Sequence, residues 1–326
     1  MANGISRRRV LGLAGLGAAN AALLAACGKP VWTDGNNPAT SGPNGGGPTP
    51  TVTPTDGLPK GSGKPVHVRL LQGDGSKWGV GMPIIAYLSS DIADAHTFAK
   101  ATKVKVNGSP VDGAWYFQQS AIYKDFPVEA HYRLEDYWPA NASIRMDLPV
   151  QGLSGGTGFV FDNSLTLDMK TGPRNITEVD GATFKLTATS DGNPVFSFPV
   201  SLGKAATPTF NGVKVVITKA AVQRMVGTDP GAQYDLEVPW SVRLTNSGEF
   251  IHSASWNGGN IGVRSTSHGC TNLTEAAAKQ YYDFAQIGDV TVYTNTGGPT
   301  MPSWDGYGDW NLAWATWRAG GIYKTT

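Results

Sequence analysis

The sequence contains few cysteines and no excess of charge of one sign. Cys27 and Cys270 are the only cysteines among 326 residues, which excludes a framework of several disulfides. The 26 Lys and Arg residues almost balance the 25 Asp and Glu residues, and no long run of one charge occurs. A basic stripe that could bind nucleic acid is therefore missing, and we expect no nucleic-acid partner.

The residues that are abundant favour a β-rich protein. Glycine (42) and proline (21) are frequent, and aromatic residues make up 10% of the chain. This composition is typical of a turn-rich β protein with a tethering segment rather than a helical bundle. The length is sufficient for about two domains.

Residues 1–27 have the pattern of an export signal. Arg7-Arg8-Arg9 resembles a twin-arginine motif, and an uncharged stretch over 10–26 leads into Leu24-Ala25-Ala26-Cys27. Small residues suit cleavage by a signal peptidase, and this ending resembles a bacterial lipobox, in which Cys27 becomes lipidated. The alternative is a membrane-spanning helix, for which the stretch is short and weakly apolar. We predict a signal peptide with a lipobox and a protein anchored by lipid to the outer face of the cell membrane.

The chain then divides into a linker and two β-rich domains. Residues 28–63 are rich in Gly, Pro and Thr and are predicted to be a disordered linker. Residues 64–153 contain short alternating runs separated by turns, which predict an immunoglobulin-like β-sandwich. Its histidines, His67, His96 and His131, are scattered along the domain and form no cluster with acidic residues or cysteines, so we expect them to be structural or solvated.

Residues 154–297 predict a second β-rich unit with one convincing helix. Two hairpins are expected, over 182–198 and over 240–252, and the second one ends at His252. Thr274 has the features of an N-cap, and the Ala-rich residues 275–284 predict a helix. Residues 298–326 form a Trp-rich segment in which Trp310, Trp314 and Trp317 have helical spacing. We expect this segment to pack on the second β-rich unit; a platform for stacking carbohydrate is the alternative.

Candidate catalytic residues gather between His252 and Asn272. If Cys27 carries lipid, Cys270 is a single exported thiol, and it is preceded by Ser267-His268-Gly269. A free thiol with an ordinary pKa is only about 3% thiolate at pH 7, and a nearby imidazole base can raise the reactive fraction. The amides of Gly269 and Cys270 are candidates for stabilising an oxyanion. The alternative for Cys270 is a small buried core residue.

This stretch resembles the signature of the L,D-transpeptidase (YkuD-type) catalytic domain. The match begins at His252 and continues fifteen residues later at Ser267. Ser267 opens the run Ser-His-Gly-Cys-Thr-Asn, which ends at Asn272. Residues 79–85 and 135–140, together with the tail, resemble the immunoglobulin-like domain and the C-terminal segment of the mycobacterial-type enzymes. The resemblance implies a mainly β chain with an immunoglobulin-like sandwich, a YkuD-type domain with one or two helices, and a short Trp-rich C-terminal segment.

The resemblance also implies roles for individual residues. Cys270 is the nucleophile, His252 is the base, and the backbone carbonyl of Ser253 orients the His252 ring. His268 and Gly269 shape the nucleophile loop, and the hydroxyl of Tyr234 lies at the oxyanion hole. The residues implied in substrate binding are Met225 on a lid, Trp256, Ser267 and Asn272.

The implied reaction is acyl transfer between peptidoglycan stem peptides. Cys270 attacks the meso-diaminopimelate carbonyl of a donor tetrapeptide and expels D-alanine, and the amine of an acceptor diaminopimelate resolves the thioester. No cofactor or metal is implied, and carbapenems are implied as covalent inhibitors.

Three alternatives remain at this stage. The same site could serve an L,D-carboxypeptidase or endopeptidase, in which water resolves the thioester. His252, His268 and Cys270 could bind a metal, although a closed site needs a fourth ligand. The chain could also be a non-catalytic cell-wall-binding lipoprotein.

Overall fold

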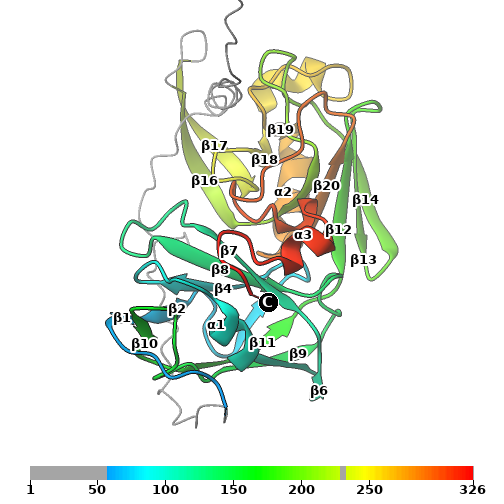
Figure 1. Ribbon diagram of the computed structural model, residues 1–326. Coiled ribbons are helices and arrows are strands. Elements are labelled where there is room, and N and C mark those ends of the chain that lie inside the picture. Colours follow the sequence, from blue (N-terminus) through cyan, green and yellow to red (C-terminus); the bar gives the residue numbers. More distant parts are fainter. Residues whose placement is uncertain (1–56, 228–232, 326) are drawn as a thin grey trace, which may run out of the picture.

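The computed structural model describes residues 57–227 and 233–325. The predicted signal peptide, the lipobox and the predicted linker up to residue 56 lie outside the described residues. Within the described ranges, every helix is too short or too polar to cross a membrane. Two β-rich units are visible, one below the other in Figure 1.

The first unit is a sandwich of a four-stranded and a five-stranded sheet. The strand orders are β2-β4-β8-β7 and β3-β11-β9-β5-β6, while β1 pairs with β10 in a separate ladder. The elements are β1 (Lys64–Val66), β2 (Val68–Leu70), β3 (Ser76–Trp78), β4 (Ile84–Leu88), α1 (His96–Ala101), β5 (Lys103–Val106), β6 (Ser109–Pro110), β7 (Ala114–Gln119), β8 (Val128–Arg133), β9 (Ser143–Leu148), β10 (Phe159–Phe161) and β11 (Leu165–Thr171).

Burial patterns show which faces of the two sheets are covered. β5 and β11 bury alternate residues, as expected for a sheet with one solvated face. β4 and β8 are buried at every position, which means that both faces of their sheet are covered. One face packs on the sandwich core, where Ile84, Phe117 and Met146 are fully buried, and the other faces the C-terminal segment.

The first unit extends beyond the boundary that the sequence predicted at 153. β11 pairs antiparallel with β9, with Leu165 opposite Leu148, and parallel with β3. Residues through Thr171 therefore belong to the sandwich. The alternation of β11 would fit either unit, and only its non-local pairing assigns it. At the other end, β1 begins at residue 64 as predicted, although Lys60 already bridges to Leu153.

The second unit contains a five-stranded and a four-stranded sheet, ordered β14-β13-β12-β20-β15 and β16-β17-β18-β19. The helix α2 contributes Ala278 and Tyr281 to a core shared with Leu186 and Val242 of the two sheets. The elements are β12 (Asn175–Asp180), β13 (Lys185–Ser190), β14 (Asn193–Pro199), β15 (Gly212–Val215), β16 (Thr218–Gly227), β17 (Tyr234–Arg243), β18 (Phe250–Ser253), η1 (Ser255–Asn260), β19 (Thr271–Leu273), α2 (Glu275–Phe284) and β20 (Val290–Thr294).

Local signals in this unit predicted the elements well. The helix over 275–284 is confirmed, with the side chain of Thr274 accepting a hydrogen bond from the amide of Ala277 at 3.4 Å. Both predicted hairpins form, as β13–β14 and β17–β18. His252 lies in β18, one residue before its end.

The C-terminal segment contacts the catalytic domain, on which it was predicted to pack, and also the first unit. Asn311 does hold the second unit, because its side chain bonds both the amide and the carbonyl of Val213, at 2.7 and 2.9 Å. Further along, Trp317 donates to the carbonyl of Ala114 in β7 at 2.9 Å, and Gly321 bridges to Phe117. The segment therefore joins the two units, as its red ribbon in Figure 1 shows.

A single buried cation organises the tryptophans of this segment. Trp310 lies in η2 (Asp309–Asn311), whereas Trp314 and Trp317 lie in α3 (Trp314–Arg318), so the three do not share one helix as their spacing predicted. Their rings nevertheless converge on Arg133 of β8, whose Cζ lies 4.6, 5.3 and 4.4 Å from the respective ring centres. Cation–π attraction of this kind is strongest when the cation is desolvated.

His131 is structural, as expected, and it has two acidic partners: Glu129, two residues before it in β8, lies 3.7 Å from its Nε2, and the other comes from the far end of the chain. Its Nδ1 lies 2.9 Å from Asp309 Oδ1, and Asp309 comes from the C-terminal segment. Burial lowers the pKa of His131, but the Asp309 carboxylate outweighs it and raises that pKa above its ordinary value. The ion pair therefore fastens the segment to the outer face of β8.

We predict that Arg133→Met weakens the attachment of the C-terminal segment. The substitution keeps an unbranched side chain but removes the cation and its hydrogen bonds to Leu312 and Leu134, at a cost of at least about 2 kcal/mol. Amide hydrogen exchange over 309–325 should accelerate. The matched control is Arg145→Met, in an exposed ion pair with Asp147, which should cost less than about 1 kcal/mol. Equal effects of the two variants would contradict this account.

Candidate active site

Strand pairing brings the predicted base and nucleophile together. β18 and β19 are parallel neighbours, with His252 opposite Asn272 and Ile251 opposite Thr271. Cys270 immediately precedes β19, so it lies beside the strand that carries His252. The chain turns into this position at Gly269, whose φ of +124° favours glycine. The intervening loop folds locally as the 3₁₀ helix η1.

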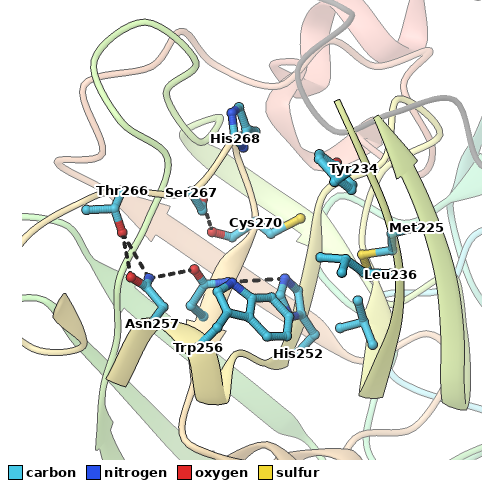
Figure 2. Close-up of a pocket in the computed structure, with 12 residues that line it drawn as sticks. Met225, Tyr234, Leu236, His252, Trp256, Asn257, Thr266, Ser267, His268 and Cys270 are labelled. Carbon is cyan, nitrogen blue, oxygen red and sulfur yellow. Dashed lines mark hydrogen bonds between the residues drawn. The ribbon is translucent and has the colours of Figure 1, made fainter. Parts of the chain in front are cut away.

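The two residues line one cavity of about 230 Å³. Figure 2 shows the Cys270 sulfur pointing toward the hairpin of β16 and β17, which carries Met225, Tyr234 and Leu236. Eight of the predicted site residues lie on the wall, and four wall residues were not predicted. The predicted ones are Met225, Tyr234, His252, Trp256, Ser267, His268, Cys270 and Asn272, and the others are Leu236, Val238, Asn257 and Thr266.

The His252 ring is held at both nitrogens. Its Nδ1 lies 2.7 Å from the carbonyl oxygen of Ser253, as predicted, and its Nε2 lies 3.1 Å from Nδ2 of Asn272. A carbonyl can only accept, so Nδ1 carries the proton and Nε2 presents its lone pair. Trp256 stacks beside the ring, with centroids 6.1 Å apart and planes 26° apart. This tautomer is the one that can take a proton at Nε2.

Cys270 is held within a tight loop and is 6% exposed. Its thiol is oriented toward the carbonyl of Gly248, 3.7 Å away. Ser267 accepts from the Gly269 amide at 3.2 Å and donates to the Cys270 carbonyl at 2.6 Å. The Gly269 amide, which the sequence proposed as an oxyanion donor, is therefore engaged inside the loop.

His268 and Tyr234 lie on the opposite side of the cavity from Trp256. The Nε2 of His268 lies 3.0 Å from Nζ of Lys204, and its ring centre is 6.0 Å from that of Tyr234. Burial lowers the pKa of His268, and the Lys204 cation lowers it further. His268 is therefore neutral at pH 7, in keeping with a role in shaping the loop.

A buried ion pair lies behind the nucleophile loop. Nζ of Lys214 bonds Oε2 of Glu249, and both side chains are buried. Glu249 also accepts from the Phe210 amide at 2.7 Å, and the Lys214 ammonium lies 3.7 Å from the ring centre of Tyr293. Burial raises the pKa of Glu249 to about 7, although Lys214 opposes the shift. The sequence carries no local signal of this pair, because Lys214 sits in an ordinary alternating strand.

The C-terminal segment also supports the turn that faces Cys270. Asp305 is fully buried and accepts from both the amide and the hydroxyl of Ser247, at 2.6 and 2.5 Å. Thr245 in turn accepts from the amides of Gly248 and Glu249. These bonds set the position of the Gly248 carbonyl next to the thiol.

The hydroxyl of Thr271, the residue after the predicted nucleophile, has a partner inside the fold. Thr271 is buried, and its hydroxyl lies 2.7 Å from that of Tyr293, which satisfies it.

Over residues 57–227 and 233–325, no group of three or more His, Cys, Asp or Glu side chains is arranged to hold a metal ion.

We predict that Lys214 and Glu249 are coupled in stability. Lys214→Met or Glu249→Gln leaves the remaining group without its buried partner and should cost about 3–5 kcal/mol, whereas the double variant should recover most of that loss. Urea unfolding of all three proteins measures the coupling. The exposed pair Lys279–Asp283 on α2 provides the control, for which the same cycle should give less than about 1 kcal/mol. Additive losses at Lys214 and Glu249 would show that the pair is not coupled.

Comparisons with known proteins agree with this geometry. Residues 174–293 match the L,D-transpeptidase catalytic domain (YkuD), and residues 58–154 match a bacterial Ig domain (Big_10). L,D-transpeptidase 2 of Mycobacterium tuberculosis is 33% identical over 266 residues, which cover 78% of this chain and 63% of that relative. The chain thus spans less than two thirds of the length of this curated relative.

Solved structures share the fold. An L,D-transpeptidase from Mycobacterium smegmatis superimposes with a TM-score of 0.57 and 25% identity, over 71% of this chain and all of that one. An L,D-transpeptidase in complex with imipenem has a TM-score of 0.57 and 22% identity, over 73% of this chain and 99% of that one. The chain is thus similar to the L,D-transpeptidases in having an Ig domain followed by a YkuD domain that holds a Cys–His site.

Proposed function

We propose that the protein is a peptidoglycan L,D-transpeptidase that links two meso-diaminopimelate residues through a thioester on Cys270. The observation that carries the proposal is the common cavity of Cys270 and His252 within the matched catalytic domain. The Nδ1–H tautomer of His252 supports it further, since Nε2 then has a lone pair for the thiol proton.

The first step is acylation of the cysteine. His252 Nε2 takes the thiol proton, and the thiolate attacks the diaminopimelate carbonyl carbon of a donor tetrapeptide to form a C–S bond. The carbonyl electrons return as the C–N bond to D-alanine breaks, and the imidazolium gives its proton to the leaving amine. Tyr234, on the wall near Cys270, is the proposed hydroxyl donor to the oxyanion, where one good donor is worth roughly 3–4 kcal/mol.

The second step transfers the acyl group to an amine. The side-chain amine of an acceptor diaminopimelate attacks the thioester carbonyl carbon to form an amide C–N bond, and the C–S bond breaks. The proton that the amine loses passes through His252 to the departing sulfur. Met225, Leu236 and Val238 form an apolar wall over this site, which limits the entry of water and favours transfer over hydrolysis. The side chains of Trp256 and Ser267 complete the proposed substrate surface.

The same thiol is the proposed target of β-lactams. A solved relative with the same fold is in complex with imipenem, and a carbapenem carries an activated carbonyl that a cysteine thiolate can attack. Acylation of Cys270 would add the whole ring-opened drug to the protein, without a leaving group.

We also propose that the protein is exported and held by lipid on Cys27 at the outer face of the cell membrane. The support is the pattern of residues 1–27, with a basic start and Leu24-Ala25-Ala26-Cys27. Peptidoglycan lies outside that membrane, so such an anchor would keep the catalytic domain within reach of its substrate through the Pro- and Thr-rich segment that follows.

Product analysis tests the enzymatic proposal. Wild type incubated with a purified disaccharide-tetrapeptide should release D-alanine and form a crosslinked dimer, detected by mass spectrometry. Cys270→Ala should form no product while unfolding at nearly the same temperature, and His252→Ala should acylate at least about 10²-fold more slowly. Tripeptide without dimer would indicate an L,D-carboxypeptidase. An active Cys270→Ala protein would exclude the thioester mechanism.

Metabolic labelling with a fatty acid tests the anchor. The full chain expressed in an actinobacterial host should incorporate label and sediment with membranes. Cys27→Ser should lose both properties, because the lipid is attached to that sulfur, while Cys270→Ser should keep them. A labelled Cys27→Ser protein would refute the assignment of the lipobox.

A further inference from the structure

A continuous chain of side-chain hydrogen bonds runs from the surface to the catalytic histidine. Arg264 donates through Nε to Asn260 Oδ1, and Asn260 Nδ2 lies 2.7 Å from Asn257 Oδ1. Asn257 Nδ2 lies 3.0 Å from Asn272 Oδ1, and Asn272 Nδ2 lies 3.1 Å from His252 Nε2. Figure 2 shows the inner links as dashed lines between Asn257 and His252.

The two ends of this chain dictate the same direction for every link. The guanidinium of Arg264 can only donate, so Asn260 must turn its oxygen outward and its NH₂ group inward. The carbonyl of Ser253 can only accept, so His252 must carry its proton on Nδ1. Between these ends, each amide accepts on one side and donates on the other, and aligned links of this kind strengthen one another.

Local folding explains why these side chains meet. Asn257 and Asn260 are three residues apart in η1, and side chains at that spacing are eclipsed in a 3₁₀ helix. Asn272 faces His252 across the parallel pair β18–β19. Asn257 is 9% exposed and Asn272 is 3% exposed, so neither amide can readily exchange its partner for water. Thr266 holds Asn257 in addition, with contacts of 2.9 and 3.0 Å.

We propose that Asn257 is a positioning residue that keeps Nε2 of His252 unprotonated through Asn272, and that Arg264 sets the direction of the whole chain. The proposal rests on the proposed function for its catalytic consequence, since the Nε2 lone pair is what accepts the thiol proton. When Nε2 gains that proton, its bond from Asn272 is lost, because two donors then face each other. The protonated ring is thereby primed to pass its proton on to the leaving amine.

Reversal of the chain tests the proposal. Asn257→Asp is nearly isosteric but presents only acceptors, so Asn272 must turn its NH₂ toward Asp and its oxygen toward His252 Nε2. Acceptors then face both ring nitrogens, since Ser253 still faces Nδ1, and a proton on Nε2 as well as on Nδ1 is favoured. We expect ¹⁵N NMR of the His252 ring to show Nε2 changing from an unprotonated to a protonated signal. Acylation of the purified protein by imipenem at saturation should slow by about 10- to 10³-fold, within the about 10⁴-fold cost of a wrong histidine tautomer.

Substitution at the exposed end separates positioning from structural support. Arg264→Glu places an acceptor where a donor is needed and should favour a proton on His252 Nε2 in the same way, with a smaller loss of acylation rate because water can relieve the mismatch. Arg264→Lys keeps a donor and should restore the wild-type NMR signal and rate. The NMR readout does not depend on which reaction the site catalyses, so it stands even if the proposed function fails.

The expected pattern is a protonated Nε2 in Asn257→Asp and Arg264→Glu but not in Arg264→Lys. An unprotonated Nε2 and an unchanged acylation rate in the two reversing variants would overturn the proposal. If Asn257→Asp does not fold, Arg264→Glu decides alone, because its side chain is exposed and is not part of the core.

Discussion

The parallel pairing of β18 with β19 is the constraint on which the site depends. It places His252 opposite Asn272 and, by the same register, sets Cys270 at the entrance of β19. Parallel neighbours need a connection long enough to return to the same edge. The loop between the two strands supplies this length and also folds into η1, which contributes Asn257 to the wall of the cavity. One strand pair thus determines the nucleophile, the base and the group that orients the base.

The surroundings of this strand pair are unusually polar for a protein interior. Lys214, Glu249 and Asp305 are buried behind the nucleophile loop, and an amide chain lies on the other side of His252. Satisfied polar networks of this kind hold side chains in one arrangement, whereas a hydrophobic core of equal size tolerates several. Acyl transfer needs a thiol, a ring nitrogen and a carbonyl in defined positions. The polar networks hold the residues around the site in such positions, and the cost is the desolvation of the buried charges.

What could be predicted from the sequence followed from local signals and from one long motif. Thr274 and the Ala-rich run after it predict a helix, which is present. The spacing of His252 and Cys270 predicts the reactive pair. The missed features join residues that are distant in sequence. Lys214 and Glu249 are 35 positions apart, and Arg133 meets tryptophans from the far end of the chain. From the sequence, Asn257 is predicted only as a loop residue. Its hydrogen bonds to Asn260 and Asn272 follow from the eclipsed geometry of η1 and from the burial of Asn272, which the sequence does not show.

The bridge from Gly321 to Phe117 has a consequence for the order of assembly. The amide of Phe117 donates to the carbonyl of Gly320, and the amide of Ile322 donates back to Phe117, so this segment covers the free edge of β7. A chain that emerges N-terminus first exposes that edge until nearly every later residue has followed. Bare strand edges recruit other chains, so a newly made molecule is vulnerable to mispairing throughout that interval. The free edge of the Ig domain can therefore be covered only after the catalytic domain has been made, although the residues of the Ig domain come first in the chain.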